Sequence, residues 1–404
     1  MTTELLAILA ISLATPQSAP AHPQATPAAA KAQQSPWRGV IDQAFDIASL
    51  VPADVHGRDR AKLQALACEA LVRAGEVDRA IGLGSRIDGW RRGEVYAVAA
   101  LELAKQGKAD EATMIAKRAL GVAPSVLDWQ RERIRVSVAR VYAWLGDESG
   151  ASELEKGAGE PEMGRVAAAK AARIATAAVP AEYFDAQMKS LEDWIRTKNF
   201  DLVRNSVEVA LEFYPGAIAD PARRARIESL VDEAIEQVPY DLRIRFHLRM
   251  ADALVARGDR DAARARIGRA EAVVKQFKWL VEDEVVQRAA VAEAKIVLGD
   301  ADAARSDLDG ALALFDAGRT GIVDIYRARP LRAVAAAYMH LGDEPKARAA
   351  YLRALDEGSV NPNARPRAED LVATLVSMAE SRIAPDAEAS AKVAAIRAGL
   401  VAPW

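Results

Sequence analysis

The sequence contains a single cysteine, Cys68, among 404 residues. An internal disulfide framework and a cysteine-rich zinc site are therefore excluded. Aromatic residues make up only 5% of the chain, and 54 basic and 57 acidic residues leave a net charge of -3. This balance lacks the basic excess of nucleic-acid-binding proteins, so we expect no nucleic-acid partner. The length accommodates two or three domains at roughly 150 residues each.

Common catalytic and phosphate-binding motifs are also missing. The sequence has no GxxxxGK[ST], GxGxxG, GxSxG or HExxH pattern. The four histidines, His22, His56, His247 and His340, are far apart, and none has a cysteine or second histidine at metal-ligand spacing. We therefore predict a protein that is not an enzyme and that has no metal and no cofactor. Cys68 occupies a small-residue packing position of a helix and is expected to be a buried structural thiol.

Long hydrophobic runs are absent beyond the N-terminus, so we expect no stable membrane insertion of the mature chain. Residues 5–14 form an apolar run shorter than the roughly 20 residues that span a bilayer. This run is typical of a secretory signal, and Ala19-Pro20-Ala21 offers a cleavage pattern, although Glu4 and the lack of a basic residue before the run are not typical. Prolines then recur through residues 15–36, which indicates a flexible or extended linker. We predict a signal peptide and linker over residues 1–36 and a periplasmic or secreted protein; the alternative is a cytoplasmic protein with an Ala/Pro-rich leader.

One short phrase recurs through the remaining sequence: an apolar helix end, a glycine, one or two acidic residues and an alanine. It occurs at 73–80, 105–112, 144–151, 256–263, 297–304 and 340–347, and in a divergent form, with Lys198 in place of glycine, at 196–203. Glycine accepts the left-handed conformation that ends a helix, and a following aspartate caps the next helix. Each phrase therefore predicts a helix, a tight turn and an antiparallel helix.

Fixed offsets from these turns carry small residues. Alanine or cysteine lies seven residues before each of the six glycines, and alanine lies five residues after each. Small residues at facing positions allow two helices to approach closely. The best copy, AYMHLGDEPKARAAYLRAL at 337–355, resembles the tetratricopeptide repeat, and its signature positions are Tyr338, Gly342, Ala347, Tyr351 and Ala354.

The resemblance implies an all-α, right-handed superhelical solenoid of antiparallel helix pairs. The spacing between turns departs from the family's 34 residues, ranging from 32 to 60, so inserted helices are expected at 164–178 and 221–237. The stretch from Pro215 to Pro221 is the expected break between an N-terminal unit (37–216) and a C-terminal unit (217–404). A final helix pair near 366–383 and 386–399 is expected to cap the array.

In this family the first helix of each pair lines a concave groove, which is the expected binding surface. The candidate groove residues are expected on the groove face of these first helices and are Arg133, Arg140, Trp144, Arg245, Arg329, Arg332 and His340. Arginines there could bind an acidic peptide through forked hydrogen bonds. Acidic residues such as Glu69 and Glu192 at nearby offsets favour ordinary surface pairing instead. The asparagine of the family's carboxylate clamp is missing at the matching positions, so that activity is not expected.

The sequence thus predicts a non-catalytic scaffold or adaptor that binds a protein or peptide, in a bacterial cell envelope. Two alternatives stay open. One is a hydrolase that uses a carboxylate pair on a helical scaffold. The other is a cytoplasmic regulator whose repeats sense a small ligand.

Overall fold

The computed structural model describes residues 36–175 and 179–404. The expected signal peptide and linker over residues 1–36 lie outside the described residues, apart from Pro36 itself. Within the described part, every regular element is helical: 19 α-helices and two short 3-10 helices, η1 (Ala123–Ser125) and η2 (Arg319–Gly321). The predicted all-α class is therefore confirmed.

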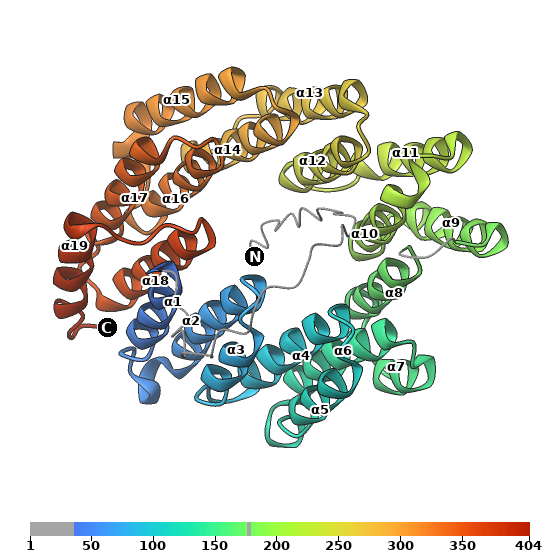
Figure 1. The fold of residues 1–404 in the computed structure, drawn as a ribbon, viewed down its shortest axis with the longest axis horizontal. Helices are drawn as coiled ribbons and strands as arrows, with labels where there is room; N and C mark the ends of the chain where they lie inside the picture. The colour runs from blue at the N-terminus through green and yellow to red at the C-terminus, as the bar shows by residue number, and fades with distance from the viewer. Residues whose placement is uncertain (1–35, 176–178) are drawn as a thin grey trace, which may run out of the picture.

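The helices form two concentric rows (Figure 1). The inner row contains α2 (Ala53–Arg73), α4 (Trp90–Lys105), α6 (Asp128–Leu145), α8 (Glu160–Ala175), α10 (Phe200–Ala217), α12 (Tyr240–Ala256), α14 (Val281–Leu298), α16 (Asp324–His340) and α18 (Ala364–Glu380). The outer row contains α3 (Val77–Gly84), α5 (Ala109–Leu120), α7 (Glu148–Glu155), α9 (Ala181–Arg196), α11 (Pro221–Ile235), α13 (Arg260–Gln276), α15 (Ala301–Gly318), α17 (Glu344–Gly358) and α19 (Ala387–Ala398). Each inner helix packs on the next inner helix, which makes the chain a solenoid of antiparallel pairs.

The solenoid closes into a ring, whereas the resemblance implied a superhelix that ends in a capping helix pair. The first helix, α1 (Pro36–Ala48), packs against α18 as well as α2, and α18 also contacts α2 directly (Figure 1). One cluster of buried residues runs from Val40 to Val141 and continues from Leu355 to Leu400. The final pair, α18 and α19, lies within three residues of the expected bounds but does not present a free end, because α18 lies between α16 and the N-terminal helices.

Ion pairs cross the seam between the two ends of the chain. Arg73 of α2 donates through Nε to Glu380 Oε1 of α18 at 2.8 Å. Arg365 Nη1 of α18 lies 3.7 Å from Asp59 Oδ2 of α2. Residues separated by about 300 positions in the sequence therefore close the ring, and neither end of the array needs a separate capping repeat.

The six predicted glycine turns are confirmed, and all of them lead from an inner helix to an outer one. Gly75, Gly107, Gly146, Gly258, Gly299 and Gly342 have φ values between +78° and +90°. Asp147, Asp259 and Asp343 then accept a hydrogen bond from a backbone amide in the first turn of the outer helix, whereas Asp300 makes no such bond. These turns lie on one edge of the ring, which we call the turn rim.

The seventh predicted turn has the opposite direction. Lys198 has φ 57° as expected of a helix-ending residue, but it joins outer α9 to inner α10. Asn199 caps α10 through its side chain. The expected insertions at 164–178 and 221–237 correspond to α8 and α11. α8 continues the inner row between α6 and α10, and α9 and α11 both pack on α10 from the outer row, so neither helix is an insertion.

Small residues occupy the helix contacts as predicted. Cys68, Ala100, Ala139, Ala251 and Ala292, each seven residues before a turn glycine, are fully buried. Pro215, at the expected break between two units, lies inside α10, and one cluster of buried residues extends from Ala171 to Leu298 across it. The division at residue 216 stays a prediction. Among the described helices, none combines the length and apolar character needed to cross a membrane.

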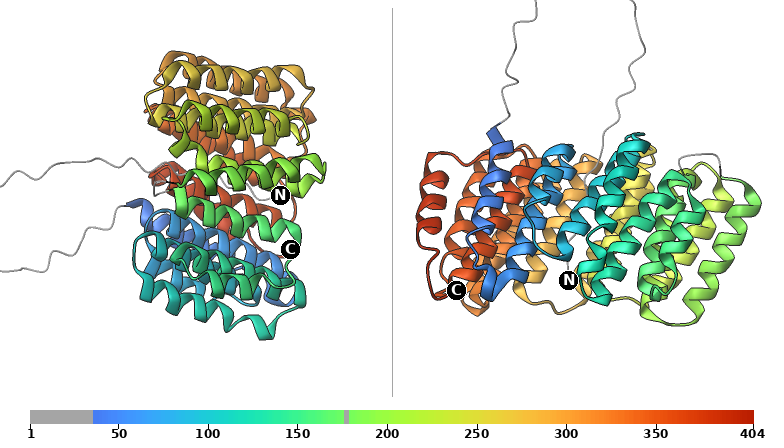
Figure 2. Two further views of the ribbon diagram at one scale, coloured as in Figure 1. Left: turned by 90° about the vertical axis from the view of Figure 1, so that its right-hand side faces the viewer. Right: turned by 90° about the horizontal axis from the view of Figure 1, so that it is seen from below.

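Because neighbouring helices are antiparallel, every inner helix begins at the same edge of the ring, opposite the turn rim. We call this edge the loop rim; the connections from each outer helix to the next inner helix and the first residues of the inner helices form it. The view of the ring from its edge shows the helices running between the two rims (Figure 2).

Candidate functional site

The seven predicted groove residues all lie on inner helices, in three separate sectors. Arg133, Arg140 and Trp144 belong to α6, Arg245 belongs to α12, and the other three belong to α16. They therefore do not form one binding patch. The Nζ atom of Lys105 of α4 lies 5.7 Å from the centre of the Trp144 ring. Arg140, one turn before Trp144 on α6, is half-buried.

Arg133 of α6 and Arg245 of α12 pair with carboxylates of the preceding inner helix. Arg133 Nε donates to Glu94 Oε1 of α4 at 3.2 Å. Arg245 Nη2 donates to Glu208 Oε1 of α10 at 2.8 Å, and Arg249 donates to the same carboxylate. These pairs neutralise the positive charge on which binding of an acidic peptide would depend.

The three residues of α16 are paired in the same way. Arg329 donates to Asp283 of α14, and Arg332 Nη1 donates to Asp370 Oδ1 of α18 at 2.8 Å. His340 Nδ1 lies 3.2 Å from Glu293 Oε1 of α14. The inner helices are thus connected by ion pairs, which agrees with the reading of these charges as ordinary surface pairing.

A group of titratable side chains spans α12, α14 and α16. Burial, reinforced by the nearby Glu293 carboxylate, raises the pKa of Asp252 to about 6. The hydrogen bond to Glu293 raises the pKa of His340. An aspartate and a histidine with displaced pKa values beside a second carboxylate are an arrangement that acid–base chemistry uses. Among the described residues, no three His, Cys, Asp or Glu side chains converge as metal ligands do.

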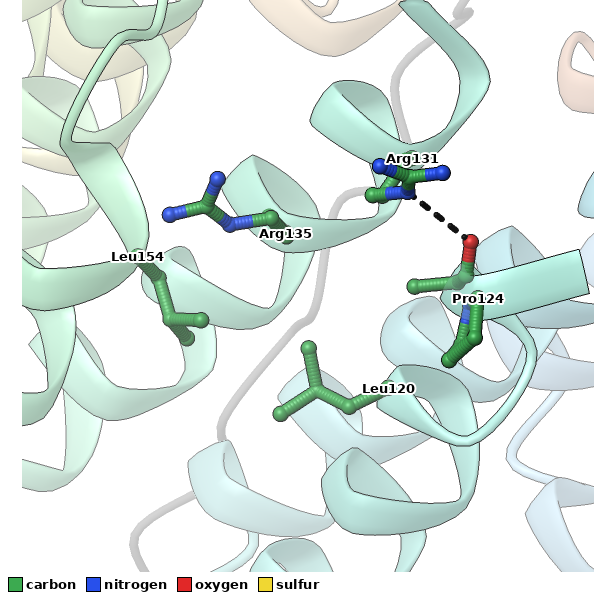
Figure 3. A pocket seen from close by; sticks show the side chains of 6 residues that line it. Leu120, Pro124, Arg131, Arg135 and Leu154 are labelled. Atoms are coloured by element: carbon green, nitrogen blue, oxygen red, sulfur yellow. Dashed lines mark hydrogen bonds between the residues drawn. The ribbon is translucent and has the colours of Figure 1, made fainter. Parts of the chain in front are cut away.

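A pocket of about 470 Å³ opens between outer helices α5 and α7, over α6. Figure 3 shows Leu120 and Leu154 on its apolar sides and Arg131 and Arg135 across it. Arg131 Nε donates to the carbonyl of Ala123 at 3.3 Å, and Arg135 Nη2 donates to the carbonyl of Glu153 at 3.1 Å. Both guanidinium groups are therefore held by the backbone, and the pocket is an open depression close to the loop rim.

The loop rim carries most of the exposed large apolar side chains of the described chain. Of fourteen such residues, twelve lie there: Leu50, Val55, Leu127, Trp129, Phe200, Tyr240, Leu280, Val323, Ile325, Tyr326, Val360 and Val401. The other two, Met114 and Val297, lie on α5 and in the last turn of α14. Single exposed apolar residues are ordinary, but their concentration on one surface indicates an interaction site.

Aromatic rings with arginine neighbours strengthen this surface at two places. Trp90 and Trp129 pack edge to face with ring centres 5.2 Å apart, and the Arg91 guanidinium lies 4.1 Å from the centre of the Trp90 ring. Farther round the ring, Tyr240 stacks on Phe277. Tryptophan, tyrosine and arginine are the residues that dominate binding energy at protein interfaces.

Helix capping differs between the two rims. At the turn rim, aspartate precedes α7, α11, α13, α15, α17 and α19 at the capping position. At the loop rim, the capping positions of α6, α14 and α16 are Leu127, Leu280 and Val323. Polar capping residues stabilise a helix by about 0.5–2 kcal/mol relative to apolar ones. At these three positions the loop rim keeps apolar residues where folding alone favours polar ones, whereas Asn199 and Asn363 precede α10 and α18. This local conflict at three helices is the sequence signal that could have located the surface.

The fold and these surfaces define the class: the chain is an all-α helical-repeat protein. No protein-family model and no curated protein matches the sequence. A solved structure described as a "Circular tandem repeat protein with novel repeat topology and enhanced subunit contact surfaces" is similar at 14% identity, over 90% of this chain and 94% of that one, with a TM-score of 0.28. At that TM-score the likeness says nothing further about this chain.

Proposed function

We propose that the protein is a non-catalytic interaction scaffold of the tetratricopeptide type that binds a protein partner through its loop rim and acts in the bacterial cell envelope. The single observation that carries the proposal is the gathering of twelve exposed apolar side chains on one edge of the ring. Water-exposed apolar surface of this extent is maintained in proteins where a partner covers it.

Two features favour the loop rim over the inner helices as the binding surface: the ion pairs of the inner helices and the apolar capping residues of the loop rim. The inner-face arginines are paired with carboxylates of neighbouring helices, so a partner would have to displace existing ion pairs to reach them. Apolar residues at the loop-rim capping positions need no such displacement and gain free energy when a partner removes them from water.

The test is crosslinking of the full chain in its native cells, followed by identification of the captured proteins. We compare the wild type with two matched double variants, Leu280→Asp/Val323→Asp at the loop rim and Arg133→Gln/Arg329→Gln on the inner face. The loop-rim variant should lose its crosslinks and the inner-face variant should keep them. Equal capture by all three proteins would show that the loop rim is not the binding surface. Sequencing of the native N-terminus tests the envelope location, because export predicts a start near His22 or Thr15.

One observation supports the second candidate, a hydrolase with a carboxylate pair. Asp252, whose pKa is raised to about 6, faces the negative charge of Glu293, as a general acid beside a second carboxylate would. A broad hydrolase screen of the wild type and the Asp252→Asn and Glu293→Gln variants tests this candidate. Reproducible turnover that either substitution abolishes would replace the scaffold proposal.

A further inference from the structure

We propose that the loop rim is an interface between two copies of this chain, which associate face to face as rings around a two-fold axis. The inference rests on the proposed function, because it names the protein partner that covers the rim. Three properties of the surface point to a second copy: its shape, its area and the distribution of its charges.

The shape of the surface requires a broad partner. The exposed apolar residues lie at or just before the starts of α2, α6, α10, α12, α14 and α16 and in the connections beside α1, α18 and α19, so they occur in most sectors of the closed ring. A peptide or a single helix would cover one sector and leave the others in water. A second ring has the same diameter and can cover all sectors of the rim at once, as an isologous interface in a two-fold dimer does.

The area is sufficient for a stable dimer. Leu280 is 66% exposed and Trp129 is 52% exposed, and ten further large apolar side chains share the surface. Twelve side chains of this exposure provide an area of the order of the ~800 Å² per partner that a stable protein interface buries. The Trp90–Trp129 pair and the Tyr240–Phe277 stack place large rings at separate points of this area, which suits them as anchors.

Four exposed charges of the rim differ in sign between its two halves. On the half that contains α2 and α4, Asp54 and Asp88 are exposed, with Arg58 one turn farther along α2. On the half that contains α10 and α14, Lys198 and Lys278 are exposed. Within the described residues, neither these two aspartates nor these two lysines form an ion pair. A two-fold axis in the plane of the rings brings the acidic half of one copy opposite the basic half of the other, twice over, which favours this pairing over a parallel one.

The capping residues make a test possible that separates folding from association. Leu280→Asp and Val323→Asp place a preferred capping residue at the start of α14 and α16, so they should raise the melting temperature of the single ring. The same changes place two charges per copy within the interface and should weaken association. A gain in folding stability together with a loss of dimer is a result that general damage to the fold does not produce.

The experiment is sedimentation equilibrium of the full chain over a range of concentrations from nanomolar to about 100 µM. The wild type should be a dimer at micromolar concentrations, and the Leu280→Asp/Val323→Asp variant should raise the dissociation constant at least tenfold. Met114→Glu/Val297→Glu is the matched control, because it charges the two exposed apolar residues that lie off the loop rim, and its dissociation constant should equal that of the wild type.

A charge-reversal pair tests the orientation. Lys278→Glu should weaken the dimer, and mixing it with a chain that carries Asp54→Lys should restore association as a heterodimer if α2 of one copy faces α14 of the other. A wild type that stays monomeric at every concentration overturns the proposal. If that monomer still crosslinks to other proteins through the rim, the second-copy inference fails while the scaffold proposal stands. If the rim variant changes neither sedimentation nor crosslinking, both fail.

Discussion

Arg332 Nη1 donates to Asp370 Oδ1 at 2.8 Å, and this pair joins α16 to α18 beside the seam where the ring closes. The two side chains are only 15% and 12% exposed. Burial raises the pKa of Asp370 even though Arg332 stabilises its charged form. The residue that the sequence offered as a ligand-binding arginine is thus held inside the structure by a carboxylate from the next repeat.

Breaking this pair from one side should be strongly destabilising. In Asp370→Asn, Arg332 stays buried without a countercharge, and we expect a loss of about 3–5 kcal/mol in the free energy of unfolding. Urea denaturation followed by circular dichroism measures it. The double variant Arg332→Met/Asp370→Leu removes both charges and should recover most of the loss, since apolar residues of similar volume replace a buried pair at little cost. A double variant no more stable than Asp370→Asn would mean that the ion pair is needed for more than mutual neutralisation.

Two glycines in one helical hairpin give opposite expectations for the same substitution. Gly258 has φ +82° in the turn before α13, and Gly268 lies within α13; a Cβ atom at either position meets nothing within 4 Å. Gly258→Ala should destabilise the fold by about 1–2 kcal/mol because the left-handed conformation disfavours a side chain. Gly258→Val should cost more, since its side chain is β-branched. Gly268→Ala should stabilise by up to about 1 kcal/mol, as alanine is favoured within a helix.

Thermal melting of these variants checks the prediction, since steric clashes cannot explain a difference between two open positions. Equal melting temperatures for Gly258→Ala and Gly268→Ala would contradict the left-handed turn. Arg382 provides the reverse test. It has φ 57° at the turn between α18 and α19, so Arg382→Gly should raise the melting temperature.

The sequence contained enough information for the local structure of the repeats and too little for their path in space. Glycine and aspartate at fixed offsets define a turn through local sterics and hydrogen bonds, which is why Gly75 and Gly342 were placed correctly. Closure depends on a small rotation between successive pairs, summed over the whole array. No short sequence motif specifies that rotation, so the contact of α1 with α18 could not be predicted.

The partners of the inner-face charges were missed for a different reason. Arg245 pairs with Glu208 and Arg133 with Glu94, at separations of 37 and 39 residues, which is about one repeat. A search at that period could have found them. The wrong direction at Lys198 arose because a helix-ending residue looks alike at either rim. The predicted groove residues do lie on inner helices. The loop rim was not predicted as a binding surface, because most of its residues lie in the connections or at the first positions of helices.

The pH dependence of folding should contain a contribution from His340. The hydrogen bond to Glu293 raises the pKa of His340 above its ordinary value of 6.5. The folded state therefore binds the proton more tightly than the unfolded state. The stabilisation is complete below pH 6.5 and is lost as the pH rises through the folded-state pKa. Asp252 acts in the same sense at lower pH, because its pKa is raised from 3.8 to about 6, so stability falls as the pH rises from about 4 to 6.

Comparison of variants isolates this contribution. Unfolding free energies of the wild type and His340→Gln, measured from pH 6 to 8.5, should converge as the pH rises, with the wild type the more stable at pH 6. Burial and Arg266 lower the pKa of His247 to about 4, so this residue makes the unfolding free energy rise with pH. Its contribution is the same in the wild type and in His340→Gln and cancels when their unfolding free energies are subtracted. A difference that does not change with pH would show that the His340–Glu293 bond is not charge-assisted.

Because the ring is closed, a destabilising substitution in α1 should also destabilise the last repeats. Phe45 of α1 is fully buried in the cluster that includes residues of α18. Phe45→Ala should destabilise by about 3–5 kcal/mol through the cavity it leaves. Hydrogen exchange followed by mass spectrometry should then show faster exchange in α1, α2 and α18, with little change in α10.

Phe246→Ala on α12, an equally buried position, is the matched control and should accelerate exchange in α12 and α14 but leave α18 protected. In an open array the end of the chain is remote from Phe45, so unchanged exchange in α18 of the Phe45→Ala variant would rule out the closed ring in solution.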